Sequence, residues 1–310
     1  MASSTSVVPN RTTSTGGGFF GRFKTGLKLS KDSLAVIRDH PKLVVFPTLG
    51  MIATFIFWFV FLVPLWIAGM FGTGIEMVVL FLLYFLSTFA ATFFTASLVF
   101  AVNQAFHGEE PMLGESMQAA WRRKTPILVW SAIAATVSVI LKKANESNNT
   151  LARIATSMFA VGWTVLTFFI VPVIVFEDVT VKSMFTRSGQ TFRDTWGESL
   201  GIGLGVTLLQ FVIGIAGLVA ALALAAIFWM LTPALGILIG IFLVAGVLIG
   251  TYLIGQTIWG ITKTALYVYA AEERVPKQFE NFNFETLDGR AAKSATPGSV
   301  ENPPLHLNNR

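Results

Sequence analysis

The sequence predicts an all-α fold: a polytopic transmembrane helix bundle of six spans with three amphipathic interfacial helices, in a threefold helix–span–span repeat. First, the chain holds no Asp, Glu, Lys or Arg from Ser199 to Thr262, whereas one bilayer crossing needs only about 20 apolar residues. Second, four shorter uncharged runs precede this one. Third, charged residues make up only 13% of the chain, about half of their share in soluble domains. Because a charge in hydrocarbon costs about 2.5–3.5 kcal/mol, these patterns indicate a chain surrounded by lipid.

The predicted membrane domain covers residues 19–275, between a disordered N-terminal tail at 1–18 and a disordered C-terminal tail at 276–310. The first tail is rich in Ser, Thr and Gly and shows no apolar segment of a cleavable signal peptide. The second tail is polar and contains Pro297, Pro303 and Pro304, a composition typical of disorder.

Helix-start signals divide the uncharged runs into spans. Thr232-Pro233 places a capping hydroxyl before a proline in the first helical turn, which separates the last two spans, and Thr125-Pro126 repeats the pattern. The segment from Thr195 to Glu198 fits a capping box ahead of the fifth span. The predicted spans cover about 43–70, 75–106, 125–142, 152–176, 198–228 and 233–265.

A short segment with an apolar stripe and surrounding basic residues precedes each pair of spans, a pattern typical of a helix lying in the membrane interface. Ser33, Ser116 and Ser188 each stand five residues before a basic or aromatic residue near the end of their segment. We therefore predict a threefold repeat, although basic and amphipathic loops between spans are also common without one. The three segments are Phe20–Ile37, Leu113–Lys124 and Val181–Trp196.

The distribution of Lys and Arg predicts the orientation in the membrane. Of the 22 Lys and Arg residues, only Lys142, Lys143 and Arg153 fall opposite the N-terminal side. Positive charge favours the cytoplasmic face, so we expect a multi-pass protein of the cell (cytoplasmic) membrane with both termini in the cytoplasm.

Several motifs together resemble a known family. They are Trp121–Val137, Thr167–Asp178, Ser188–Glu198 and Thr264–Pro276, and they resemble the DUF6159 family over roughly residues 26–280. The resemblance implies a prokaryotic six-span membrane protein and implies no activity. The segment Pro172–Ser188 is also similar, more loosely, to membrane domains attached to glycerophosphodiester phosphodiesterases. The chain shows no phosphodiesterase domain, so that activity is not implied.

The composition excludes several kinds of site. The chain has no cysteine, which excludes disulfides and thiolate ligands. His40, His107 and His306 are far apart, so we expect no metal site and no cofactor. The net charge of +5 is scattered over helix ends, and we therefore expect no nucleic-acid partner.

The polar candidates inside the spans are amides: Asn103, Gln104, Gln210 and Gln256. Such groups either form interhelical hydrogen bonds, worth about 0.5–2 kcal/mol each, or line a solute path. The acidic pair Glu177-Asp178 follows the fourth span. It either caps the third interfacial helix through Asp178 and forms ion pairs, or binds a cationic headgroup.

Glycines at small-xxx-small spacing mark the last two spans, in the pairs Gly201/Gly205, Gly236/Gly240 and Gly246/Gly250. This spacing lets helix backbones approach closely. It predicts either a tight hairpin of spans five and six within one chain or a contact in a homo-oligomer.

The function predicted from the sequence is non-enzymatic interaction with the lipid bilayer or with partner proteins. Basic residues at the interface would contact anionic phospholipid headgroups, at about 1 kcal/mol for each Lys or Arg. The alternative is a transporter or channel for a small neutral or lipidic solute, with a polar cavity between spans two, five and six. The candidate headgroup contacts are Arg122, Arg123, Lys124, Lys182, Arg187 and Arg193.

Overall fold

The computed structural model describes residues 19–70, 73–146, 149–196, 202–272 and 274–279, and over these residues the regular structure is helical. The predicted tails at 1–18 and 280–310 and the Gly197-Glu198 end of the predicted capping box lie outside the described residues. The helices are α1 Phe19–Asp39, α2 Val45–Ile67, α3 Ile75–Phe106, α4 Leu113–Arg122, α5 Lys124–Asn145, α6 Thr150–Leu166, α7 Ile170–Phe176, α8 Val181–Trp196, α9 Ile202–Leu231 and α10 Pro233–Glu272, with 3₁₀ turns η1 Pro41–Val44 and η2 Lys277–Phe279.

The six predicted spans are confirmed as segments long and apolar enough to cross a membrane. The boundary between the last two spans also agrees with the sequence, because α9 ends at Leu231 and α10 begins at Pro233. The six segments within the described residues are Pro41–Ile67, Met77–Phe106, Lys124–Asn145, Thr150–Phe176, Gln210–Met230 and Gly236–Ala271.

The fourth span differs from the single helix expected over 152–176, because it breaks between α6 and α7. Pro172 has no backbone N–H, and its ring would clash with the carbonyl of Phe168 in a continuous helix. The chain turns at 167–169, and the backbone N–H of Phe169 donates to the Ser188 hydroxyl of α8 at 3.1 Å. The break therefore turns the end of this span toward α8.

The end of α3 is closed by a glycine. The N–H of Gly108 donates to the carbonyl of Ala105, and the N–H of Glu109 donates to the carbonyl of Gln104. Gly108 has φ +80°, so this is the left-handed helix end that glycine adopts without strain. The turn directs the chain from α3 back toward α4.

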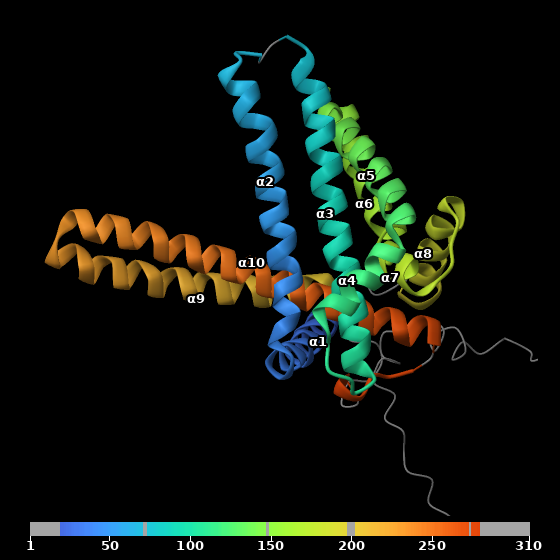
Figure 1. The fold of residues 1–310 in the computed structure, drawn as a ribbon. Coiled ribbons are helices and arrows are strands. Elements are labelled where there is room, and N and C mark those ends of the chain that lie inside the picture. The colour runs from blue at the N-terminus through green and yellow to red at the C-terminus, as the bar shows by residue number, and fades with distance from the viewer. Residues whose placement is uncertain (1–18, 71–72, 147–148, 197–201, 273, 280–310) are drawn as a thin grey trace, which may run out of the picture.

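The helices diverge from a common base (Figure 1). Helices α2, α3, α5 and α6 extend in one general direction, whereas the α9–α10 hairpin extends crosswise to them. The arrangement differs from the single bundle of six spans expected from the sequence, because the α9–α10 hairpin does not run beside the other spans. Since lipid tails are as apolar as leucine, no hydrophobic force draws the outer parts of separate hairpins together.

The buried core lies in this base, which we define as α1, α4, α7 and α8 with the adjoining parts of α3, α5 and α10. Phe279 of η2 belongs to it: its side chain is fully buried and packs edge-to-face on Phe106, with ring centroids 5.8 Å apart. The segment 276–279, expected as the start of a tail, is therefore packed. Core residues include Leu29, Val36, Ala101, Val102, Ile127, Val173, Met184, Ile261 and Leu266.

Candidate functional site

The three recurrent serines of the short helices are all buried. Ser33 of α1 shares a hydrogen bond of 2.9 Å with Thr262 of α10. The Ser116 hydroxyl of α4 shares its hydrogen between the Met112 carbonyl at 2.8 Å and, more weakly, Oε1 of Gln104 in α3 at 3.3 Å. Ser188 of α8 accepts the hydrogen bond from the backbone at the α6–α7 break. Each serine thus attaches its short helix to a membrane span.

The acidic pair after α7 joins several elements of the base. Nε of Arg187 lies 2.9 Å from Oε1 of Glu177, and the Tyr267 hydroxyl of α10 donates to the same oxygen at 2.5 Å. Arg123 donates to Asp178 at 3.1 Å. Glu177 raises the pKa of Arg187 through its hydrogen bond and its charge. The pair therefore connects the α7–α8 loop to the α4–α5 joint, α8 and α10.

The start of α8 is capped by Thr180 instead of Asp178. The Thr180 hydroxyl oxygen accepts the backbone N–H of Ser183 at 3.4 Å, and the Ser183 hydroxyl oxygen accepts the backbone N–H of Thr180 at 2.8 Å. This reciprocal pair satisfies donors that a helix start leaves open. Asp178 is consequently available for its ion pair with Arg123.

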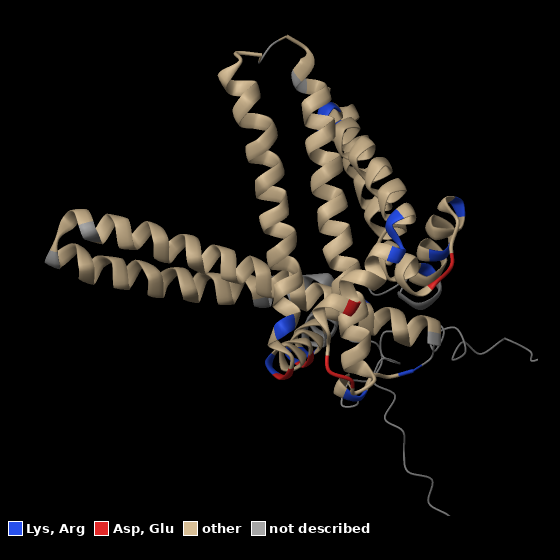
Figure 2. Cartoon of the chain, viewed as in Figure 1, with Lys and Arg blue, Asp and Glu red and all other residues tan. Residues whose placement is uncertain are grey.

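The candidate headgroup contacts divide into two groups. Arg123 and Arg187 form ion pairs in the base, and the side chain of Arg187 is nevertheless exposed. The other four are also exposed: Arg122, Lys124, Lys182 and Arg193. Of these, Arg122, Lys124 and Lys182 form no ion pair with a described residue. Figure 2 shows most charged residues around the base, and the described outer part of the α9–α10 hairpin carries none.

The joint between α4 and α5 combines basic and aromatic groups. Trp121 is 54% exposed, and Nζ of Lys124 lies 5.3 Å from the centroid of its ring. Arg122 is exposed beside it. Aromatic and basic side chains together are typical of the zone between lipid tails and water.

Of the two candidate amides of α3, Gln104 forms the contact with α4. Gln104 accepts the backbone N–H of Met112 at 3.2 Å and donates to Glu115 at 3.2 Å. Asn103 is half-buried, and its Oδ1 has no hydrogen-bond partner among the described residues. Gln104 therefore holds α4 on α3.

The other two amides are separated from each other. Gln210 of α9 packs directly on Gly255 of α10, where a Cβ atom would overlap its amide group. Gln256 lines a cavity of about 780 Å³ between α2, α3 and α10. The expected cavity lay between spans two, five and six, whereas this one lies between spans one, two and six. Of the four candidate amides, Gln256 is the one that lines it.

The cavity also contains a cation that sequence reasoning placed near a span end and did not single out. Nζ of Lys263 lies 5.0 Å from the ring centroid of Phe168 and 5.5 Å from that of Trp259. No described carboxylate pairs with it. Such cation–π contacts contribute about 0.5–2 kcal/mol, and the half-buried ammonium group has no opposite charge beside it. The available signal was that apolar sequence continues beyond Lys263 to Ala271.

The α9–α10 hairpin is closed by glycines that face the opposite helix. A Cβ atom at Gly240 would lie 2.9 Å from Cβ of Ala225, and one at Gly217 would lie 2.8 Å from Cγ1 of Val247. In contrast, Gly246 and Gly250 have no heavy atom within 4 Å of such a position. Glycine packing within the chain therefore involves only part of the set, and a homo-oligomer contact stays a prediction. Gly201 lies outside the described residues.

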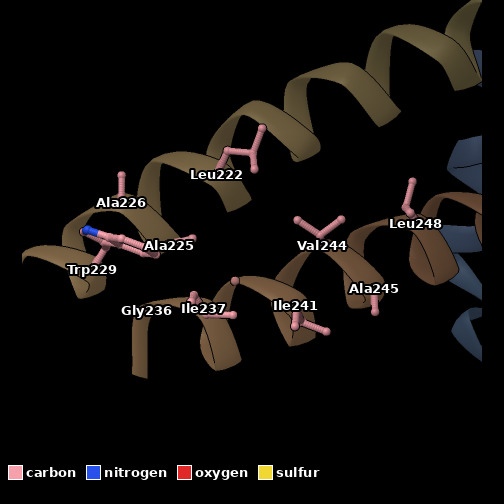
Figure 3. A pocket seen from close by; sticks show the side chains of 11 residues that line it. Leu222, Ala225, Ala226, Trp229, Gly236, Ile237, Ile241, Val244, Ala245 and Leu248 are labelled. Carbon is pink, nitrogen blue, oxygen red and sulfur yellow. The ribbon is translucent and has the colours of Figure 1, made fainter. Parts of the chain in front are cut away.

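A second cavity, of about 680 Å³, opens within this hairpin (Figure 3). Leu222 and Trp229 of α9 and Ile241 and Val244 of α10 are among the side chains that line it. Its lining is apolar except for the indole N–H of Trp229, so it offers a single hydrogen-bond donor and no charged group to a ligand.

Comparison with curated proteins and with solved structures finds no similar protein. One family model, described as "Family of unknown function (DUF6159)", matches residues 74–277. The match begins at the second span and extends to η2, and it confirms the resemblance seen in the sequence motifs. The chain is a multi-span membrane protein and belongs to the DUF6159 family.

Proposed function

We propose that this protein is a non-enzymatic membrane protein whose base binds anionic phospholipid headgroups. The observation that carries the proposal is the α4–α5 joint, where Arg122 and Lys124 are exposed beside the exposed ring of Trp121. Neither cation has an ion-pair partner among the described residues. Each would contribute about 1 kcal/mol of attraction to an anionic membrane surface.

The same proposal assigns α1, α4 and α8 to the cytoplasmic interface of the cell membrane, with both termini on that side. Each short helix precedes a hairpin of spans, and each is attached through a buried serine at the recurrent position. These common contacts support a threefold repeat. The exposed Lys182 of α8 adds a further cation to the proposed surface.

A path for a lipidic solute is the second candidate function. The observation that favours it is the cavity between α2, α3 and α10, which contains Gln256. A path for a small neutral solute is favoured less, because Gln104 is engaged with α4 and Gln210 packs on Gly255. We therefore place lipid binding first.

The test compares the double variant Arg122→Gln/Lys124→Gln with the wild-type full chain in detergent. Bound phosphatidylglycerol and phosphatidylcholine are quantified by native mass spectrometry during a lipid titration. At about 1 kcal/mol for each charge, the variant should lose most of a roughly 30-fold preference for phosphatidylglycerol. Arg123 is left unchanged because it holds Asp178.

The matched control is Lys142→Gln/Lys143→Gln, which removes two exposed lysines from the other end of α5. This control should keep the wild-type preference for phosphatidylglycerol. An unchanged preference in the Arg122/Lys124 variant would refute headgroup binding at the α4–α5 joint. An equal loss in both variants would show that net charge alone determines the preference.

A further inference from the structure

We propose that the groove between α2, α3 and α10 binds one anionic lipid, with its charged head at Lys263 and its acyl chain directed toward Leu248 and Phe55. This inference goes beyond the surface contact proposed above, because it places a lipid between the spans. The two sites use different cations and can fail independently.

The charge of Lys263 is the first argument. The ammonium group has three hydrogen-bond donors, and none of them bonds to a described residue. The rings of Phe168 and Trp259 contact the cation but accept no conventional hydrogen bond. Since no described carboxylate pairs with Lys263, the groove presents a cation without a counter-ion. An anionic head would supply both the charge and the hydrogen-bond acceptors.

The order of the lining residues along α10 is the second argument. Tyr252, Gln256, Trp259 and Lys263 all line the groove, at spacings that place them on one helix face. At about 1.5 Å per residue, Gln256 lies about 10 Å along the axis from Lys263. Along α10, the wall thus changes from a cation, through an amide and a phenol, to the apolar side chains of Ile249 and Leu248. A lipid changes in the same order, from charged head through ester groups to acyl chain.

The position of Lys263 relative to the base is the third argument. The preceding residue, Thr262, is bonded to Ser33 of α1, and one turn further Tyr267 is bonded to Glu177. Lys263 therefore lies at the level of the charged base, where a lipid headgroup resides in the proposed orientation.

Access to the groove is the fourth argument. Phe55 is 65% exposed and Tyr252 is 51% exposed. The end of the groove that is assigned to the acyl chain therefore opens on the surface of the spans. A lipid could enter sideways from the bilayer without crossing water. The volume of about 780 Å³ falls within the range of about 300–1,000 Å³ typical of small-molecule sites.

The test titrates detergent-purified full chain with phosphatidylglycerol, phosphatidylcholine or inorganic phosphate, and native mass spectrometry counts the bound molecules. The wild type should bind one phosphatidylglycerol with high affinity. Lys263→Met should weaken this binding at least tenfold, whereas Lys263→Arg, which keeps the charge, should stay within about threefold of wild type. Equal binding by Lys263→Met and wild type would overturn the proposal.

A second variant tests the acyl-chain end and does not alter the cation. Ala91 lines the groove and is exposed, so Ala91→Trp should fill the groove and weaken phosphatidylglycerol binding at least tenfold. Ala155→Trp, at an exposed position of α6, is the matched control and should bind as wild type. Unchanged binding by Ala91→Trp would refute an acyl chain in the groove.

The remaining measurements distinguish a lipid headgroup from free phosphate as the bound anion. They also distinguish the groove from the headgroup site at the α4–α5 joint. Full displacement of the lipid by inorganic phosphate would overturn the lipid assignment, as would equally tight binding of phosphatidylcholine. The Arg122→Gln/Lys124→Gln variant should keep the single high-affinity lipid. Loss of that lipid in this variant would show that the groove is not a separate site.

Discussion

The base and the α9–α10 hairpin are held together by different kinds of contact. In the base, polar side chains connect elements that are far apart in the sequence, as Tyr267 and Arg187 do at Glu177. In the hairpin, glycines allow two apolar helices to approach closely, as at Gly240 and Ala225. The difference follows from the surroundings: in lipid, close packing holds apolar helices together, whereas near the headgroups ions and hydrogen bonds contribute as well.

The α2–α3 hairpin lies between these two cases. Gly50 of α2 faces the side chain of Phe94 with room for an ordinary contact, because a Cβ atom at Gly50 would lie 3.4 Å from Cβ of Phe94 and 3.5 Å from its ring atom Cδ2. In addition, the indole of Trp58 donates to the Ser87 hydroxyl at 3.2 Å. A polar contact therefore supplements packing in this hairpin.

The variant with the largest predicted effect tests whether the close approach of the two helix backbones stabilises the α9–α10 hairpin. In Gly236→Ala, the new Cβ would lie 2.5 Å from the backbone nitrogen of Trp229, which cannot rotate away. We expect the free energy of unfolding to fall by about 3 kcal/mol, at the upper end for overpacking. Unfolding in detergent micelles, followed by circular dichroism, measures the change.

The control for this prediction is Gly246→Ala on the same helix, where the added methyl group meets no heavy atom within 4 Å. It should leave stability unchanged or raise it by up to about 1 kcal/mol, because alanine favours helix. Similar losses in both variants would contradict the view that close packing holds this hairpin.

The second prediction tests the polar contacts of the base. Ser188→Ala removes the acceptor of the Phe169 N–H at the α6–α7 break and leaves a buried donor without a partner. The expected loss is about 2 kcal/mol of unfolding free energy in the same assay. Ser157→Ala, at an exposed serine bonded to its own helix, should change stability little. A loss as small as that of the control would mean that water replaces the serine.

The third prediction concerns the acidic pair. Tyr267→Phe removes the hydroxyl donor to Glu177 and keeps the ring stacked on Phe176 and the ion pair with Arg187. We expect a loss of about 1 kcal/mol, since Arg187 still neutralises the carboxylate. Tyr252→Phe is a matched control, because Tyr252 forms no hydrogen bond with a described residue. A larger loss of unfolding free energy in Tyr252→Phe than in Tyr267→Phe would contradict a stabilising hydrogen bond from Tyr267 in the base.

The number and boundaries of the spans could be predicted from sequence because they depend on local properties. The absence of charged residues identifies the apolar segments, and Thr232-Pro233 identifies the turn between the last two spans. The break at Pro172 was not predicted, because the uncharged run continues through it. The partner that accepts the freed N–H, Ser188, belongs to another helix and cannot be identified from local sequence.

The direction of the α9–α10 hairpin and the groove at Lys263 depend on contacts between distant segments. Hydropathy gives the length of each span and leaves its angle to the others undetermined. Lys263 resembled a residue at a span end because the uncharged run stops there. Only the packing of α10 against α2 and α3 places it inside a groove.

The smallest predicted effect is a pH dependence of the base. Burial raises the pKa of Asp32 in α1 above its usual value, while the nearby Lys28 acts in the opposite direction. The folded state therefore binds this proton more tightly than the unfolded state, so stability falls as pH rises through the raised pKa and is recovered on acidification. Because Asp32 is only half-buried, we expect a few tenths of a kcal/mol.

The variant Asp32→Asn separates this contribution from those of carboxylates whose effect on stability has the opposite pH dependence. Lys42 lowers the pKa of Glu110 through a hydrogen bond and its charge, so that pair weakens on acidification. The difference in unfolding midpoint between Asp32→Asn and wild type removes such shared contributions. Asp32→Asn should be the more stable protein at pH 7, and its advantage should disappear toward pH 4. An advantage that grows on acidification would show that Asp32 is stabilised as a carboxylate, and the base would then hold one more ionic contact that the hairpin lacks.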